Sequence, residues 1–249
     1  MDPSLHHQFA EIDSSHWWFQ GRRRVVASLL HAELGVEEDR RILDVGCGTG
    51  SMLDVLMELG SVSAMDDSSE ALQYCKARFG DRLDVRCGSI PHDLPMGELF
   101  QVVTAFDVIE HLADDLKALQ EIHRLLPPGG VLVVTVPAFP FLWGPHDVLN
   151  GHHRRYRRNE LRGVLEAAGF LVDRLSYFNT WLFPAVAALR GLRRLRPGTH
   201  EAAASDFSTP PRIVNRALGG LFSSEARFLR TRSLPFGVSL IALGRKAAG

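Results

Sequence analysis

Cysteine is scarce in this chain, whose 249 residues include only Cys47, Cys75 and Cys87. An odd number of thiols forms no even disulfide framework, and their spacing matches neither a metal site nor the cysteine cluster of radical iron–sulfur enzymes. No apolar run approaches the length of about 20 residues that crosses a bilayer. Acidic residues and histidines interrupt the region where a secretory signal would lie. These absences predict a reduced, cytoplasmic protein.

Lysine is absent from residues 152–232, although this stretch contains fifteen arginines and six acidic residues. Its net charge is +9 and that of the remaining residues is −10, so the chain as a whole carries −1. The basic stretch is either a solvated helical surface or a face that meets an anionic substrate, a carrier protein or a membrane surface. It contains no recognisable nucleic-acid-binding motif, so no nucleic-acid partner is expected.

Apolar segments of strand length alternate with helical patterns. The predicted strands are residues 41–45, 62–65, 83–87, 100–106, 131–136, 171–178 and 238–243, and the predicted helices are residues 4–35, 51–59, 68–79, 114–126, 159–168, 181–195 and 211–230. Residues 137–157 are expected to form a long loop. Because parallel strands need crossover helices, the alternation predicts an α/β fold with a parallel sheet, whose ligand lies beyond the carboxyl ends of the strands.

The first predicted strand continues into the glycine-rich loop Asp44-Val45-Gly46-Cys47-Gly48-Thr49-Gly50. Glycine lets a backbone turn tightly and approach a ligand closely. A dinucleotide fingerprint needs glycine at position 51, and Ser51 there opposes a nicotinamide-dependent reductase. Asp66 ends the second strand, where its carboxylate can accept both hydroxyls of a ribose, and Asp44 can bind an ammonium group or organise the loop. The combination indicates S-adenosylmethionine (SAM), which has a ribose but no phosphate.

Over roughly residues 40–180 the chain resembles the class I SAM-dependent methyltransferases. The segments that resemble the family are residues 43–50, Met65-Asp66-Asp67-Ser68, Gly88-Ser89-Ile90, Phe106-Asp107-Val108-Ile109-Glu110-His111-Leu112 and residues 126–130. The resemblance implies cofactor contacts from Asp44, Gly46, Cys47, Gly48, Gly50, Asp66, Asp67, Gly88, Ser89, Ile90, Phe106 and Asp107. Many members have an aspartate where this chain has Ser89. The segment around Asp107 is similar to the subgroup of ubiquinone-pathway, sugar and natural-product methyltransferases.

The resemblance also implies a Rossmann-like fold. A seven-stranded, mostly parallel sheet would have helices on both faces and residues 238–243 as an antiparallel last strand. On this basis residues 1–36 are expected to form a helical lid, residues 37–180 with 233–249 the SAM-binding core, and residues 181–232 a helical insertion or cap. The product of the cofactor would be S-adenosylhomocysteine.

Histidines near the predicted ligand site are candidates for a general base. His111 follows the fourth strand and is interpreted first as a capping or core residue, with catalysis as the alternative. His146 lies beside Asp147, which could orient its ring, and His152 follows in the same predicted loop. Arg155 and Tyr156 could hold an anionic or phenolic acceptor. The alternative interpretation is a solvated polar loop that contains histidines by chance.

An aromatic and basic run precedes the first strand. Trp18 could contact the cofactor sulfonium through its ring, and Arg22 could pair with the cofactor carboxylate. The alternative, which is compatible with this, is a lid helix that packs its tryptophans into the core. Farther along, residues 181–195 form an apolar segment followed by arginines, a pattern that either packs on the domain or touches a membrane.

The sequence therefore predicts a SAM-dependent methyltransferase that acts, without a metal ion, on an oxygen or nitrogen of a small molecule. The acceptor is expected to come from bacterial specialised metabolism or from envelope saccharides and lipids, and it could be anionic or bound to a carrier. The alternatives are a SAM-binding partner protein without catalytic activity and a SAM-fold cyclase or decarboxylase. Because one fold hosts many reactions, the acceptor stays open.

Overall fold

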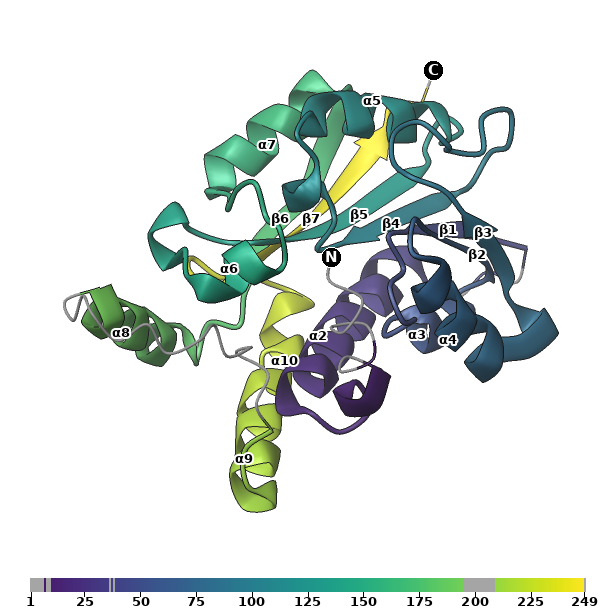
Figure 1. Cartoon of the computed structure of the whole chain (residues 1–249). Coiled ribbons are helices and arrows are strands. Elements are labelled where there is room, and N and C mark those ends of the chain that lie inside the picture. Colours follow the sequence, from purple (N-terminus) through teal and green to yellow (C-terminus); the bar gives the residue numbers. More distant parts are fainter. Residues whose placement is uncertain (1–6, 8–9, 36, 38, 195–208, 249) are drawn as a thin grey trace.

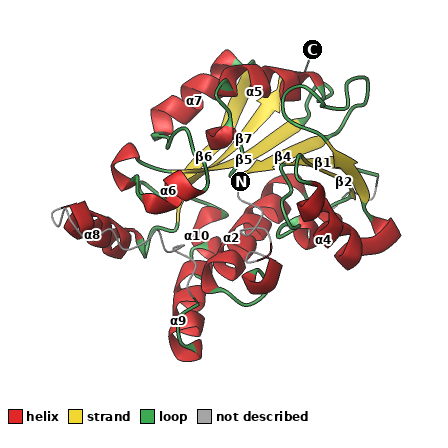
Figure 2. Ribbon diagram, viewed as in Figure 1, coloured by secondary structure: helices red, strands yellow, loops and turns green. Residues whose placement is uncertain are grey.

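The computed structural model describes residues 7, 10–35, 37, 39–194 and 209–248. Its centre is one sheet with strand order β3-β2-β1-β4-β5-β7-β6, covered by helices on both faces (Figures 1 and 2). The strands are β1 (Arg41–Val45), β2 (Ser61–Asp66), β3 (Asp84–Cys87), β4 (Val102–Phe106), β5 (Val131–Pro137), β6 (Phe170–Phe178) and β7 (Ser239–Lys246). Only β7 runs antiparallel to its neighbours, β5 and β6. The predicted Rossmann-like, seven-stranded fold is confirmed.

Alternate residues of the central strands face two separate cores. Ile42 of β1 and Val102 of β4 belong to one buried cluster, whereas the next residues, Leu43 and Val103, belong to the other. This follows from the two-residue period of a strand, in which successive side chains point to opposite faces. Because helices cover both faces, strands that are apolar throughout are stable here and would not be at a solvated surface.

The helices divide between the two faces. On the first face lie α2 (Trp17–Leu34), α3 (Leu53–Met57) and α4 (Ser69–Phe79), and on the second lie α5 (Asp115–Arg124) and α7 (Arg158–Ala167). Side-chain caps fix two of the starts: Ser68 accepts a hydrogen bond from the backbone N of Ala71 (3.2 Å), and Asp114 accepts one from Lys117 (2.9 Å). Of the two serines that could cap the helix after β2, Ser68 and Ser69, the structure uses Ser68.

Three of the expected segments are divided differently in the structure. The helix expected over residues 4–35 begins anew at Trp17 after a turn at residues 13–15, and residues 4–6 and 8–9 lie outside the described part. The loop expected over residues 137–157 contains the short helix α6 (Pro145–Leu149). Pro145 suits the first position of this helix, and Asp147 accepts the Gly144 backbone N–H at 2.8 Å, which together start it. The third difference is that the helix expected over residues 211–230 divides into α9 (Arg212–Ser223) and α10 (Ala226–Leu229).

Helices α8 (Phe183–Arg194) and α9 extend outward from the body of the molecule (Figure 1). Helix α9 packs against α2, where the Phe222 ring lies 6.2 Å from that of Trp17. A Cβ atom on Gly21 of α2 would lie 2.3 Å from the Phe222 ring, so glycine permits this close approach. Among the described residues, no helix combines the length and apolarity that crossing a bilayer requires.

Candidate functional site

The glycine-rich loop folds from the end of β1 back over β2. The backbone N–H groups of Gly46 and Cys47 both donate to the carbonyl of Met65, at 2.7 and 3.0 Å. Gly46 has φ of +69°, and a Cβ atom there would lie 2.5 Å from a methyl group of Val108. Glycine is therefore required at this turn, both for its backbone conformation and for the close approach of the segment after β4.

Asp66 holds the loop from the neighbouring strand. Its Oδ2 accepts a hydrogen bond from the Gly48 backbone N at 2.8 Å, and its Oδ1 accepts one from Ser68 at 2.9 Å. A Cβ atom on Gly48 would have no other atom within 4 Å, so the space beside this carboxylate is open. These residues fit the ribose end of SAM, because an acceptor carboxylate lies next to unobstructed backbone.

The segment after β3 lies beside Asp66. Gly88 donates its backbone N–H to the carbonyl of Asp66 at 3.0 Å. Both the backbone N and the hydroxyl of Ser89 lie within 3.1 Å of Asp93 Oδ2, and these hydrogen bonds lower the pKa of Asp93. Ile90 packs at the margin of the second core, and Asp67 follows Asp66 at the end of β2. These predicted cofactor residues therefore follow the ends of the neighbouring strands β2 and β3, and the Ser89 hydroxyl is engaged by Asp93.

Asp44 is a buried carboxyl group at the end of β1. The hydroxyl of Thr104 donates to its Oδ1 at 2.5 Å. Burial raises the pKa of Asp44 to about 7, although this hydrogen bond and the charge of Arg22 act in the opposite direction. A nearby cation would favour the ionised form, because opposite charges lower the pKa of a buried acid. Asp44 therefore fits the ammonium group of SAM.

Arg22 reaches from α2 to the end of β4. Its guanidinium lies 2.5 Å from Asp107 Oδ2, and its carbon Cζ lies 5.2 Å from the ring centre of Trp18 and 5.7 Å from that of Phe106. Asp107 has φ of +56°, which is uncommon for a residue other than glycine. The structure therefore brings together four predicted cofactor residues, and gives Arg22 a protein carboxylate as its partner.

A second cluster lies directly after Asp107. Among the described residues, Glu110, His111 and His152 have ligand atoms within 4.8 Å of one another, so this group could hold a metal ion. Glu110 is fully buried, and neither of its oxygens has a hydrogen-bond partner in the described structure. Burial raises its pKa well above the ordinary value, and the charge of Asp107 adds to this. Burial also lowers the pKa of His111 to about 4, so its ring is neutral.

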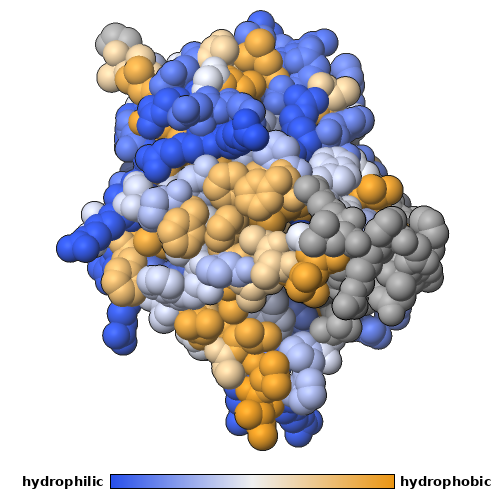
Figure 3. Space-filling view, turned by 90° about the vertical axis from the view of Figure 1, so that its left-hand side faces the viewer, coloured by the Kyte–Doolittle hydropathy of each residue, from blue (hydrophilic) through white to orange (hydrophobic). Residues whose placement is uncertain are grey.

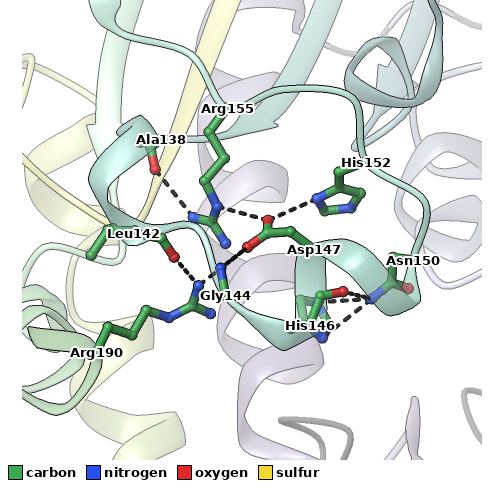
Figure 4. Close-up of polar contacts among 9 residues, drawn as sticks. All are labelled: Ala138, Leu142, Gly144, His146, Asp147, Asn150, His152, Arg155 and Arg190. Atoms are coloured by element: carbon green, nitrogen blue, oxygen red, sulfur yellow. Dashed lines mark hydrogen bonds and ion pairs between the residues drawn. The ribbon is translucent and has the colours of Figure 1, made fainter. Parts of the chain in front are cut away.

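His152 is held by Asp147, not left in a solvated loop (Figure 4). Asp147 is fully buried, and its Oδ1 lies 2.9 Å from His152 Nδ1 and 2.7 Å from Arg155 Nε. Burial tends to raise the pKa of Asp147, but His152 and Arg155 outweigh it and hold the pKa below its usual range. An ionised carboxylate beside Nδ1 favours, for a neutral ring, the tautomer whose lone pair is on Nε2.

Asp147 was expected to orient the ring of His146, and the structure places its carboxylate against the ring of His152. The His146 ring lies 3.2 Å from the side-chain nitrogen of Asn150, and its pairing with Asp147 stays a prediction. The rings of His111 and His152 meet edge to face, with centroids 4.7 Å apart. Two of the three predicted histidines therefore lie together, and the third lies 6.2 Å from His152 between ring centroids.

Arg155 and Tyr156 are buried, and both have protein partners. Arg155 also donates to the carbonyl of Ala138 at 3.1 Å, and the Tyr156 hydroxyl donates to Asp115 at 2.6 Å. Burial, followed by Asp115, raises the pKa of Tyr156, so the hydroxyl keeps its proton. Acceptor binding by these two residues stays a prediction.

Two residues of the site have no signal in the sequence that predicts their role. Glu110 belongs to a segment that resembles the family, but the lack of a hydrogen-bond partner for its carboxyl group among the described residues appears only in three dimensions. Arg190 of α8 lies 43 residues from Asp147 and contacts its Oδ2 at 3.3 Å. It also donates to the carbonyl of Leu142. No local pattern links α8 to this carboxylate.

The sheet order, the glycine loop and the acid that ends β2 define a class I SAM-dependent methyltransferase. The chain belongs to the methyltransferase domain family, which it matches over residues 18–175. It is 34% identical over 166 residues to a Mycolicibacterium smegmatis protein named as an S-adenosylmethionine-dependent methyltransferase, a match that covers 65% of this chain and 62% of the relative.

Two further comparisons agree with this assignment. The chain is 34% identical over 101 residues to the ubiquinone biosynthesis O-methyltransferase of Parvibaculum lavamentivorans, which covers 39% of this chain and 40% of the relative. The chain thus spans less than two thirds of the length of these relatives. A chain from the Haloferax volcanii complex that contains the Trm112 methyltransferase activator superposes with a TM-score of 0.64. At 22% identity it covers 99% of this chain and 96% of its own length, which shows the shared fold.

Proposed function

We propose that this enzyme transfers the methyl group of SAM to an oxygen or nitrogen atom of a small molecule, with His152 as the general base. The observation that carries the proposal is the hydrogen bond of 2.9 Å between His152 Nδ1 and the buried Asp147. The pair belongs to the loop after β5, beside the end of β4, where Asp107 meets Arg22. A carboxylate that fixes the tautomer of a histidine prepares its Nε2 atom to accept a proton.

The chain's residues supply binding, orientation and proton transfer. SAM supplies a methyl group on a positively charged sulfur and leaves as S-adenosylhomocysteine. His152 Nε2 takes the proton of the acceptor O–H or N–H group while the acceptor's lone pair forms the new bond to the methyl carbon. The electron pair of the broken carbon–sulfur bond stays on sulfur, and Asp147 stabilises the imidazolium. Aligning the reacting atoms is worth up to about 7–11 kcal/mol in the best cases.

Asp66 would bind the ribose hydroxyls and Asp44 the ammonium group, while Trp18 and Phe106 would lie near the sulfonium.

We also propose that residues 1–36 act as a lid. Buried Asp13 pairs with Arg23 at 2.8 Å, and Arg23 Nε donates to the carbonyl of Ser51 at 2.9 Å, which ties the N-terminal segment to the cofactor loop. SAM binding that is unchanged after deletion of residues 1–24 would refute the lid.

The acceptor class is proposed from the relatives and the site together. The ubiquinone-pathway relative is named as an O-methyltransferase, which supports oxygen as the methylated atom. We place the acceptor in bacterial specialised metabolism or envelope biosynthesis. The cytoplasm is the proposed location, in keeping with three free cysteines, two of them buried.

A screen of acceptor classes tests the proposal. The enzyme is incubated with SAM and a phenol, an amine, a carboxylate or a sugar nucleotide, and release of S-adenosylhomocysteine is measured. We expect release with one oxygen or nitrogen acceptor and its loss in His152→Gln, which should bind SAM as the parent does. SAM binding without release for any class would favour a non-catalytic partner protein. Conversion of an acceptor without consumption of SAM would favour a cyclase.

A further inference from the structure

Helices α8–α10 and the segment after them expose large apolar side chains. Ile213 has 84% of its surface accessible and Leu192 has 59%. Four more exposed residues belong to this surface: Leu189, Val214, Phe228 and Phe236. The face that carries α8 and α9 shows a broad apolar band and an apolar projection below it (Figure 3). Scattered apolar residues are normal on a protein surface, whereas a contiguous group indicates an interaction site.

Ring contacts join segments that are far apart in the sequence. Trp181, which precedes α8, lies 5.7 Å from Phe228 of α10 between ring centroids. Phe183 of α8 lies 5.5 Å from Phe236 and 6.2 Å from Phe141 in the loop after β5. These contacts join Trp181 to α10, and join α8 to Phe236 and to the loop after β5.

Among the described residues of this surface, the exposed charges are all of one sign. Between residues 179 and 238, the described residues include one acid, Glu225, and it is fully buried, with its Oε1 accepting the backbone N–H groups of Thr180 and Trp181. Arg212, Arg216 and Arg227 are exposed, as are Arg230 and Arg232. A second copy of this chain, placed on the same surface, would bring arginine against arginine.

We propose that the surface formed by α8, α9, α10 and Phe236 docks on a lipid bilayer that contains anionic phospholipids. Exposed leucine, isoleucine and phenylalanine side chains can enter the boundary between headgroups and acyl chains, while arginines pair with lipid phosphates. The two features are mixed on the same helices, as this mode of binding requires. Membrane docking is independent of methyl transfer, so either proposal can fail alone.

Vesicle co-sedimentation of the full chain tests the proposal. The vesicles consist of phosphatidylcholine alone or of equal parts phosphatidylcholine and phosphatidylglycerol. We expect binding to the anionic vesicles, weak binding to the neutral ones, and release at high salt. Arg216→Gln should weaken binding to the anionic vesicles by about fivefold. Equal binding to both vesicle types, or none to either, would overturn the proposal.

A pair of matched variants locates the surface. Leu192→Glu with Ile213→Glu adds two acids to the docking surface and should lower vesicle binding by at least about tenfold. Met96→Glu with Leu99→Glu adds two acids at exposed sites in the loop before β4 and should leave vesicle binding within about twofold of the parent. A SAM affinity equal to that of the parent shows that each variant is folded. Equal losses of vesicle binding in both double variants would contradict the proposal. A dimer of the parent, detected by light scattering, that the first variant dissociates while the parent fails to bind vesicles would also contradict it.

Discussion

Arg190 of α8 and His152 share a single carboxylate. Oδ1 of Asp147 forms a hydrogen bond of 2.9 Å with His152 Nδ1. Oδ2 of the same carboxylate lies 3.3 Å from a guanidinium nitrogen of Arg190 (Figure 4). Since Asp147 is fully buried, it cannot turn toward solvent when one partner moves. The position of α8 is therefore linked to the orientation of the proposed base, and the surface proposed to meet lipid begins one residue away from this contact.

Arg190→Gln tests that link. The change removes one positive partner from Asp147 and loosens the hold of α8 on the loop after β5. We expect turnover to fall by about tenfold, since small displacements of a catalytic group are costly. SAM affinity should stay within about twofold of the parent, because the contacts of Arg190 with Leu142 and Asp147 belong to the segment after β5 and not to the cofactor loop. Arg227→Gln, which removes an arginine from exposed α10, serves as the control; equal losses in both variants would refute the link.

His152→Gln and Asp147→Asn test the proposed base. Loss of a positioned base lowers turnover by about 10²–10⁴-fold when the acceptor must lose a proton. Asp147→Asn should also fold less stably, because the buried Arg155 and the partly buried Arg190 lose their counter-charge. His146→Gln should have a smaller effect, since Asp147 contacts the ring of His152 while that of His146 lies against Asn150. The double change at His146 and His152 should leave SAM affinity nearly intact. Full turnover in that double variant would remove both residues from the mechanism.

Asp44 predicts a pH dependence of SAM binding. Its pKa of about 7 means that the carboxyl group ionises near neutral pH, and only the ionised form attracts an ammonium group. SAM affinity should rise by roughly tenfold between about pH 6 and about pH 8. Calorimetric titration across this range measures the slope. Asp44→Asn should bind SAM weakly with a flatter slope, and an unchanged slope would assign the titration to another group.

The same carboxyl group affects folding in the opposite direction. Its pKa is raised in the folded protein, so ionisation costs stability without SAM. The SAM-free protein should lose stability as pH rises from about 4 to about 7, and the loss should be smaller in Asp44→Asn. Thermal unfolding measures this trend, and a melting temperature in Asp44→Asn that follows pH as steeply as that of the parent would count against it.

Gly46→Ala and Gly48→Ala separate backbone strain from steric contact. Both glycines have positive φ, so each alanine should cost roughly 1–2 kcal/mol in the free energy of unfolding. Only at Gly46 would the new Cβ atom meet a neighbour, Val108, at 2.5 Å. Gly46→Ala should therefore be the less stable variant, and adding Val108→Ala should recover part of the difference. Equal stabilities by denaturant unfolding would show that the contact relaxes without cost.

Local signals in the sequence predicted most of the secondary structure and the cofactor loop. The strands, the cap at Ser68, the glycine turn and the acid at position 66 depend on neighbours in the sequence, and their placement followed from spacing. The helix α6 was missed because five residues are too few for a helical period to appear. Which carboxylate meets which ring could not be predicted. His146 is adjacent to Asp147 in the sequence, but packing of α6 directs the acid to His152, and Arg190 arrives from α8.

The place of β7 between β5 and β6 has a consequence during protein synthesis. Strands β3, β2, β1, β4 and β5 are neighbours in the sheet and come from residues 41–137, so this part can assemble early. Strand β6 pairs with β7 alone, and β7 is formed by residues 239–246. Until those residues leave the ribosome, β6 and one edge of β5 have no strand to pair with. One edge of β5 therefore stays open while residues 138–246 are made, and β6 stays unpaired while residues 179–246 are made, a period in which the nascent chain depends on protection from aggregation.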